Sequence, residues 1–460
     1  MLHKLIIPLL SLFFLTVMPM TSPPTHSPTP ATSIDPGRIG MVIRDPWYDL
    51  GNDLNDPTYL DTVAQDRMGA MLASAGVRWV RLEFIINEQV GSVEANLARY
   101  DYFIDTVAPR HGLKILGLLA FGLITNADPR DAKYGMVAPY QSSSHPLYGF
   151  GLNDYIITWL DRALLIANRY QQRIHAYELL NEQNRLPPVA ATPGQSGFAG
   201  GEGISPAITA SLHTKFYRLF RENRCRYAPT LEPSWRDAID VIIGGLHPRG
   251  SSSYIALDGV IATPPDMSDA AYLEALFTSS AFRGYQGGSC AHYPTDGIGY
   301  HPYPVEIVGV ATLADVNEEL ARMTVRINLL RTRLTALDAQ AGASPFWITE
   351  IGYNVAYTNQ NMAGQALFLR ETFTTLGSRS DVAVIFWFKY EDFPPADGSN
   401  AQRWGIVRIP FQEDPRCPGG ACYARGGEPS LVRPSYMVLR EIAGLPVYKI
   451  HLPLVARNLP

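Results

Sequence analysis

Eight short apolar runs alternate with longer amphipathic segments, and this alternation constrains the fold more than any other feature of the chain. Most of the runs are continuously apolar, which is typical of parallel strands buried on both faces. We therefore predict eight strands. They are Ile39–Ile43, Arg78–Phe84, Lys114–Phe121, Ala176–Asn181, Ile239–Leu246, Ile298–His301, Phe346–Glu350 and Ala383–Phe388.

The segments between the runs carry apolar residues at helical spacing and end at glycines or turn residues. The expected helices are Pro57–Ala75, Ala95–Arg110, Leu152–Tyr170, Ser205–Tyr227, Met267–Phe277, Val316–Asp338, Asn361–Leu376 and Ser435–Ala443. Eight strand–helix alternations favour a closed parallel (β/α)8 TIM barrel over an open doubly wound sheet. No Gly-x-Gly-x-x-Gly follows the first run, so dinucleotide binding has no support. We expect one catalytic domain over residues 37–446.

The two ends of the chain depart from this pattern. Residues 1–22 contain one Lys followed by an almost wholly apolar stretch, which predicts a secretory signal peptide or, alternatively, an uncleaved membrane anchor. Residues 23–36 are rich in Pro, Ser and Thr and are expected to form an extended linker. The tail, residues 447–460, either packs on the barrel or acts as an export or surface signal.

Cysteine content and net charge indicate where the protein is located and which partners it lacks. The four cysteines, Cys225, Cys290, Cys417 and Cys422, fit an exported protein and allow three disulfide pairings. No paired C-x-x-C spacing indicates a metal site. The net charge is −5, without a basic block, which argues against nucleic acid as a partner. We therefore expect an extracellular or cell-surface location.

The longest loops, 122–151, 183–204 and 391–433, all follow predicted strands. In a (β/α)8 barrel such loops surround the carboxyl ends of the strands, where functional sites lie. Two acidic residues fall at this rim: Glu182 in HAYELLNEQN and Glu350 in PFWITEIGY. A carboxylate at the end of a buried strand is costly unless it is paired or solvated. Paired carboxylates are what glycoside cleavage requires: one protonates the leaving oxygen, and the other attacks the sugar or activates water.

With these residues the chain resembles the clan A glycoside hydrolases, which have Asn-Glu at the end of the fourth strand and Glu at the end of the seventh. Asn181-Glu182 ends the fourth predicted strand, and Glu350 ends the seventh. The resemblance extends from about Gly37 to Gly444.

The resemblance also implies roles for neighbouring residues. Arg81 on the second strand would contact Glu350, and Asn181 would bind the sugar 2-hydroxyl. His301 would lie near Glu182, and Tyr303 would donate to Glu350. Trp387 on the eighth strand would form the floor under the sugar that is transferred.

The resemblance implies a retaining, double-displacement hydrolase of β-linked glycans, with Glu182 as acid/base and Glu350 as nucleophile. Their carboxyl groups should lie roughly 5–5.5 Å apart. Neither a metal nor an organic cofactor is required, and the partner is a polysaccharide or oligosaccharide. The sequence leaves open the sugar, the linkage, endo or exo action and the oligomeric state. Two alternatives remain: a non-catalytic carbohydrate-binding surface protein on a glycosidase-like barrel, and a transglycosylase that uses the same residues.

Further residues follow strands and are candidates for the cleft. Four aromatic side chains, Trp47, Tyr353, Tyr390 and Trp404, are placed to stack on sugar rings or to pack in the core. Glu391 and Asp392 come just after the eighth strand and either bind hydroxyls or cap a loop.

Overall fold

A computed structural model describes residues 34–43, 60–88, 91–124, 154–184, 206–225, 234–248, 254–255, 261–262, 268–304, 311–356, 361–393, 403–413 and 421–447. The predicted signal segment, most of the linker and most of the tail lie outside the described residues. None of the described helices is both long and apolar enough to cross a bilayer.

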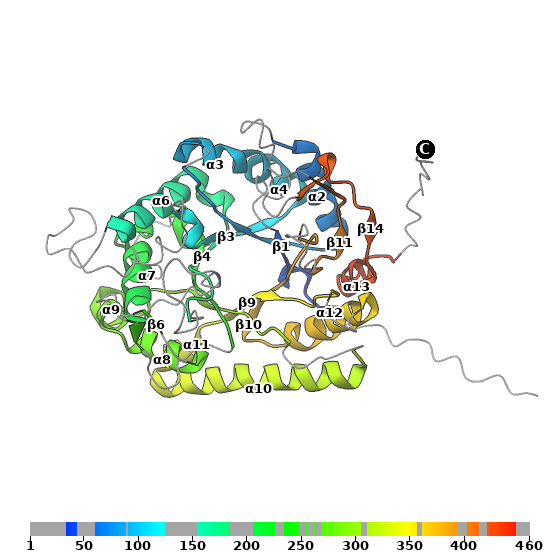
Figure 1. The fold of residues 1–460 in the computed structure, drawn as a ribbon. Helices are drawn as coiled ribbons and strands as arrows, with labels where there is room; N and C mark the ends of the chain where they lie inside the picture. Colours follow the sequence, from blue (N-terminus) through cyan, green and yellow to red (C-terminus); the bar gives the residue numbers. More distant parts are fainter. Residues whose placement is uncertain are drawn as a thin grey trace, which may run out of the picture. The chain divides into compact units, whose positions relative to one another are not determined.

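Eight parallel strands close into a barrel in the order β1-β10-β9-β8-β5-β4-β3-β2 (Figure 1). This closed barrel confirms the predicted (β/α)8 fold, and each expected strand is present within two residues at either end. The strands are β1 (Ile39–Ile43), β2 (Trp79–Glu83), β3 (Lys114–Leu119), β4 (Ala176–Leu179), β5 (Asp240–Leu246), β8 (Gly297–Tyr300), β9 (Phe346–Ile351) and β10 (Val382–Trp387).

The strands are mostly apolar because both of their faces are buried. Alternate residues point into the barrel, where one cluster joins Val42, Trp79, Leu116, Ala176, Ile242, Trp347, Val384 and Phe386. At its centre the rings of Trp79 and Trp347 meet edge to face at 5.4 Å. The other residues of each strand belong to a larger cluster that includes apolar residues of the surrounding helices.

Helices surround the barrel (Figure 1). They are α2 (Thr62–Ser74), α3 (Val93–Tyr102), α4 (Ala108–His111), α6 (Asp154–Tyr170), α7 (Pro206–Phe220), α8 (Asp269–Thr278), α9 (Ser280–Tyr285), α10 (Leu313–Leu337), α11 (Ala339–Ala343), α12 (Met362–Gly377) and α13 (Pro434–Ile442). Several begin where the sequence supplies a capping side chain: Asp61 accepts from the amide of Ala64, and Thr312 forms a reciprocal cap with Asp315.

The predicted helix over 95–110 is not a single α-helix. α3 passes through a π turn, η2 (Phe103–Val107), into the short α4, which ends at Gly112 with φ +63°. Pro109 has no amide hydrogen to donate to the carbonyl of residue 105, so regular α-helical pairing is lost in this turn.

Small antiparallel sheets lie in segments where the sequence predicted only loops. β11 (Val407–Arg408) pairs with β14 (Leu431–Val432), and β12 (Phe411–Glu413) pairs with β13 (Ala421–Tyr423). β6 (Tyr254–Ile255) pairs with β7 (Ile261–Ala262) after β5. Strands of two or three residues carry too little periodic pattern to be recognised in a sequence.

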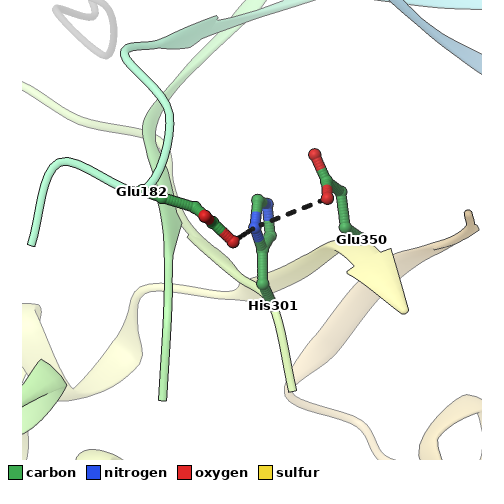
Figure 2. A group of neighbouring side chains, drawn as sticks. All are labelled: Glu182, His301 and Glu350. Atoms are coloured by element: carbon green, nitrogen blue, oxygen red, sulfur yellow. Dashed lines mark hydrogen bonds and ion pairs between the residues drawn. The ribbon is translucent and has the colours of Figure 1, made fainter. Parts of the chain in front are cut away.

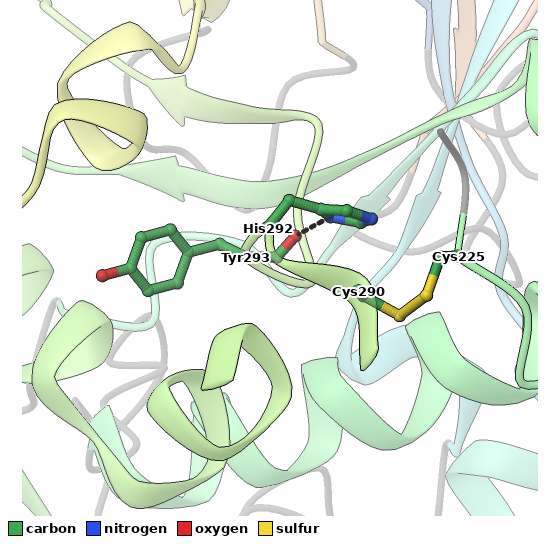
Figure 3. The surroundings of a disulfide bond; sticks show 4 residues. All are labelled: Cys225, Cys290, His292 and Tyr293. Carbon is green, nitrogen blue, oxygen red and sulfur yellow. Dashed lines mark hydrogen bonds between the residues drawn. A yellow bond between two sulfur atoms is a disulfide. The ribbon is translucent and has the colours of Figure 1, made fainter. Parts of the chain in front are cut away.

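A disulfide bond joins Cys225, after α7, to Cys290, at the end of η6 (Gln286–Cys290) (Figure 3). Cys422 is also disulfide-bonded, and Cys417 lies outside the described residues. The Cys225–Cys290 bond spans 65 residues and ties α7 to the segment that leads into β8.

Candidate active site

Polar side chains from four strands, or from the residues just after them, converge at the carboxyl end of the barrel. The structure brings together six of the seven predicted site residues: Arg81, Asn181, Glu182, His301, Tyr303 and Glu350. Glu182, His301 and Glu350 point toward one another (Figure 2). One carboxylate oxygen of each glutamate and one nitrogen of His301 all lie within 4.8 Å of one another.

An unusual backbone path aims Glu182 at this centre. After β4 ends, Leu180 and Glu182 both adopt positive φ, of 69° and 46°, which non-glycine residues rarely do. The amide of Glu182 donates to the carbonyl oxygen of Gly245 on β5 at 2.9 Å. This contact anchors the turn, and the Glu182 side chain stays 10% exposed.

Glu350 lies on β9 and both of its oxygens are held. Arg81 Nη1 donates to Oε1 at 2.5 Å, and Tyr303 Oη donates to Oε2 at 2.6 Å. Burial and the neighbouring negative charge of Glu350 raise the pKa of Tyr303 well above its usual value, so the phenol remains a donor. The two contacts fix the orientation of the Glu350 carboxyl group.

His301 lies between the two glutamates. Its Nδ1 is 3.1 Å from Glu182 Oε1 and 3.8 Å from Glu350 Oε2, and its Nε2 is 2.9 Å from Thr349 Oγ1. Burial alone would lower the pKa of His301, but the charge of Glu350 and the hydrogen bond with Glu182 outweigh it and raise that pKa. A β-carbon at Gly245 would lie 2.0 Å from His301 Nε2, so the ring packs where only glycine fits.

Sequence reasoning missed one member of the cluster, Glu178 on β4. Its Oε2 accepts from Arg81 Nε at 2.5 Å, and its Oε1 accepts from the amide of Gly245 at 2.8 Å. Arg81 therefore joins Glu178, Glu350 and, through Nη2, Asn181 Oδ1 at 2.7 Å. The available signal was a glutamate in the middle of an otherwise apolar strand, which requires a charged partner.

The expectation for Trp387 is wrong. The side chain is fully buried and packs toward α12, with its ring 6.0 Å from that of Phe368. Because alternate residues of β10 face the barrel, Phe386 lies in the interior cluster and Phe388 packs against it. Phe388, rather than Trp387, reaches the mouth of the barrel.

A pocket of about 190 Å³ opens beside Glu350. It is lined by Val42, Ile43, Arg81, Glu83, Leu118, Asn181, Glu350, Phe388 and Phe393. Its walls combine apolar side chains with the polar side chains of Arg81, Glu83, Asn181 and Glu350.

The other aromatic candidates divide between core and cleft. Tyr353 and Tyr390 are almost fully buried; Tyr353 packs on Phe368, and the Tyr390 hydroxyl contacts Met71 of α2. Trp404 lies near the site, with its ring 5.6 Å from both Tyr303 and Phe388. Trp47 lies outside the described residues.

The acidic residues after β10 form ion pairs. Asp392 accepts from Arg433 at 2.5 Å and from the amide of Gly405 at 3.0 Å. Glu391 pairs with Lys389 at 2.8 Å, and both side chains are buried. These contacts favour structural roles over the binding of sugar hydroxyls.

Glu182, His301 and Glu350 are also the kinds of side chain that bind metals. His301 Nδ1 lies 3.1 Å from Glu182 Oε1, and both oxygens of Glu350 already accept hydrogen bonds, one from Arg81 and one from Tyr303. The guanidinium of Arg81 on Glu350 would repel a cation there. The cluster therefore fits proton transfer and nucleophilic attack better than metal binding.

Comparison with known proteins relates part of the chain to glycoside hydrolases. Residues 323–403, which include Glu350 and Phe388, match the family described as glycosyl hydrolase catalytic core. The match confirms the predicted resemblance to glycoside hydrolases, and the expected enzyme class, O-glycosyl hydrolase, is that of the matched family. No curated protein sequence matches the chain significantly.

Solved structures of glycoside hydrolases are similar to the chain at low identity. A family 39 glycoside hydrolase from Bacteroides cellulosilyticus is 14% identical, with a TM-score of 0.46 over 90% of this chain and 65% of that one. A family 39 enzyme from Xanthomonas axonopodis pv. citri is 12% identical, with a TM-score of 0.48 over 89% and 67%. A β-galacturonidase of family 2 from Eisenbergiella tayi is 13% identical, with a TM-score of 0.43 over 89% and 52%. The chain thus spans about half to two thirds of the length of these relatives.

Proposed function

We propose that the protein is a retaining glycoside hydrolase that cleaves a β-linked glycan, with Glu182 as acid/base and Glu350 as nucleophile. One observation carries the proposal: oxygens of the two carboxylates approach within 4.8 Å across His301. Retaining enzymes hold their carboxyl groups about 5–5.5 Å apart, whereas inverting enzymes need about 6.5–9.5 Å to admit a water molecule.

In the first step Glu350 attacks the anomeric carbon while Glu182 protonates the departing glycosidic oxygen. Arg81 and Tyr303 contact both oxygens of Glu350 and keep its carboxyl group aimed at the anomeric carbon until attack. Asn181 lines the same pocket, and its amide is oriented because its Oδ1 accepts from Arg81. Its Nδ2 is then the donor for the sugar 2-hydroxyl.

In the second step Glu182, now a carboxylate, removes a proton from water, which attacks the anomeric carbon and releases Glu350. His301 contacts Glu182 directly and holds that carboxylate in place while its proton is donated and recovered.

We also propose that this reaction takes place outside the cytoplasm on a polysaccharide or oligosaccharide. The Cys225–Cys290 bond supports the location because stable disulfides are typical of oxidising compartments.

The test is hydrolysis by the full chain across a panel of β-glycans and aryl β-glycosides. Glu350→Gln should lose at least about 1,000-fold in kcat on the substrate that the wild type cleaves. Glu318→Gln on α10, an exposed carboxylate with a side chain that is 67% accessible, is the control and should keep full activity.

Azide separates the two roles. Glu182→Ala should cleave dinitrophenyl glycosides readily, because that leaving group needs no proton, and azide should yield the β-glycosyl azide. Glu350→Ala with azide should yield the α-azide instead. Equal turnover by wild type and Glu350→Gln would refute the nucleophile, and no turnover on any substrate by folded protein would favour a binding role.

A further inference from the structure

The turn that carries Glu182 leaves β4 in a conformation that its own residues disfavour. Leu180 and Glu182 both have positive φ, and non-glycine residues keep such a conformation only where neighbouring contacts hold them. One such contact runs from the amide of Glu182 to the carbonyl oxygen of Gly245. The two residues that follow Glu182 add further contacts through their side chains.

Asn184 and Gln183 bind the backbone of β5 and of the residue just after it. Asn184 Nδ2 donates to the carbonyl oxygen of His247 at 2.8 Å, and Asn184 Oδ1 accepts from the amide of the same residue at 2.9 Å. Gln183 Nε2 donates to the carbonyl oxygen of Gly244 at 3.1 Å. The side chains thus continue the pairing between the two segments, although β4 itself ends at Leu179.

The close approach of this turn to β5 depends on glycine. A β-carbon at Gly244 would lie 2.2 Å from the carbonyl oxygen of Leu180, and the pairing of β5 with β8 is irregular at this point. The irregular strand presents two consecutive carbonyl oxygens, those of Gly244 and Gly245, to residues 182–183. β5 therefore offers a row of acceptors where the turn passes.

Both side chains are buried: Gln183 is 0% exposed and Asn184 is 2% exposed. Burying an amide costs free energy unless its hydrogen bonds are made, and Gln183 Oε1 has no partner among the described residues. An apolar side chain of similar size would fill the same space without that cost. Packing alone therefore does not account for an amide at position 183, whereas a contact that holds the turn does.

We propose that Gln183 and Asn184 are positioning residues that hold Glu182 where it can protonate the departing oxygen. The inference rests on the proposed function for the role of Glu182 as acid/base. Neither side chain lines the pocket beside Glu350, so neither is placed to bind a sugar ring there. Without them the turn relaxes from its strained conformation and the Glu182 carboxyl group moves, while the groups that hold Glu350 are unchanged.

The test uses the leaving group to separate a positioning role from a general loss of structure. Proton donation matters for a phenyl glycoside and hardly matters for a dinitrophenyl glycoside, whose leaving group departs as an anion. kcat/KM is measured with the full chain on both glycosides of the sugar that the wild type cleaves. The variants are Asn184→Ala and Gln183→Met, with Glu182→Ala as the reference.

Asn96→Ala is the matched control. Asn96 lies on α3, is 1% exposed, and also uses its side chain to bind backbone groups. It accepts from the amide of Asn87 and donates to the carbonyl oxygens of Asn87 and Gly91, in the segment after β2. Its replacement removes the same kind of buried contact without touching the turn that carries Glu182.

Asn184→Ala and Gln183→Met should each lower kcat/KM for the phenyl glycoside about 10- to 100-fold, as expected when a catalytic group is displaced by about 1 Å. For the dinitrophenyl glycoside, kcat/KM should change less than about threefold, and kcat and KM should fall together because the second step still needs Glu182 as base. Glu182→Ala should show the same pattern with a larger loss. Asn96→Ala should change kcat/KM less than about threefold on both substrates.

Equal losses on both substrates in Asn184→Ala and Gln183→Met, wild-type activity in both, or a selective loss in Asn96→Ala would overturn the inference. A selective loss in Glu182→Ala that neither positioning variant shows would leave the proposed function standing and refute the positioning role. Equal losses on both substrates in Glu182→Ala would refute its role as the acid, and the positioning role would fall with it. Circular dichroism checks folding, and Gln183→Met, which keeps the size of its side chain, decides the outcome if Asn184→Ala does not fold.

Discussion

Replacing Glu178 by Gln should lower catalytic activity, although Glu178 does not contact the substrate. Both oxygens of Glu178 accept hydrogen bonds, one from Arg81 Nε and one from the Gly245 amide, and the side chain is fully buried. Gln offers one acceptor and one donor group. In either orientation its NH2 group faces an N–H donor, so one bond is lost and a repulsive contact replaces it.

The expected losses of stability and of rate follow from the contacts that Arg81 makes. Removing one partner of a buried ion pair costs about 3–5 kcal/mol of unfolding free energy. We expect about 3 kcal/mol because Arg81 keeps its contact with Glu350. A shift of Arg81 by about 1 Å would also misplace Glu350, and misplacement of that size costs about 100-fold in rate, or about 2.7 kcal/mol. Since orientation rather than binding is lost, the fall should appear in kcat more than in KM.

Asp296 provides a matched control. It is a carboxylate that is paired with buried Arg221 at 2.8 Å and accepts from the amide of Val241 at 2.8 Å, and it does not line the pocket. Asp296→Asn should cost similar unfolding free energy and leave kcat unchanged. Urea unfolding followed by circular dichroism and kinetics on the cleaved substrate measure both variants. If Glu178→Gln loses stability as Asp296→Asn does but keeps kcat within twofold, Glu178 does not position Arg81.

Three further predictions address other parts of the structure. Gly245→Ala should lower kcat at least about tenfold because the new methyl group displaces His301; full activity on the same substrate would contradict this packing. Burial lowers the pKa of His213 to about 4, so the unfolded chain takes up a proton that the folded chain refuses, and stability is lost as pH falls from about 6.5 to 4. In urea titrations, His213→Leu should therefore lose about 2–3 kcal/mol less unfolding free energy than the wild type between pH 7 and pH 4.5. Equal losses in the two proteins would refute this effect. Replacing Cys225 and Cys290 together by Ser should lower the unfolding free energy by about 4 kcal/mol, which is the value expected for a disulfide that closes a loop of this length. The same urea unfolding assay measures it. An unchanged urea midpoint would show that the bond constrains the unfolded chain little.

Sequence pattern alone identified the barrel and the two glutamates because both depend on local order. Eight apolar runs that alternate with helices leave few other topologies, and the carboxyl ends of parallel strands must share one rim. Glu182 directly follows one such run, and Glu350 ends another. Their placement therefore needed no knowledge of distant contacts.

Only the tertiary structure decided which strand residues face the barrel and which partners buried charges find. β10 is apolar at every position, so its sequence does not distinguish the inward Phe386 and Phe388 from the outward Trp387. Arg81 and Glu178 are 97 residues apart, and no local pattern joins them. The physical reason is that a strand buried on both faces loses the alternation that marks its sides, while ion pairs depend on distances in space.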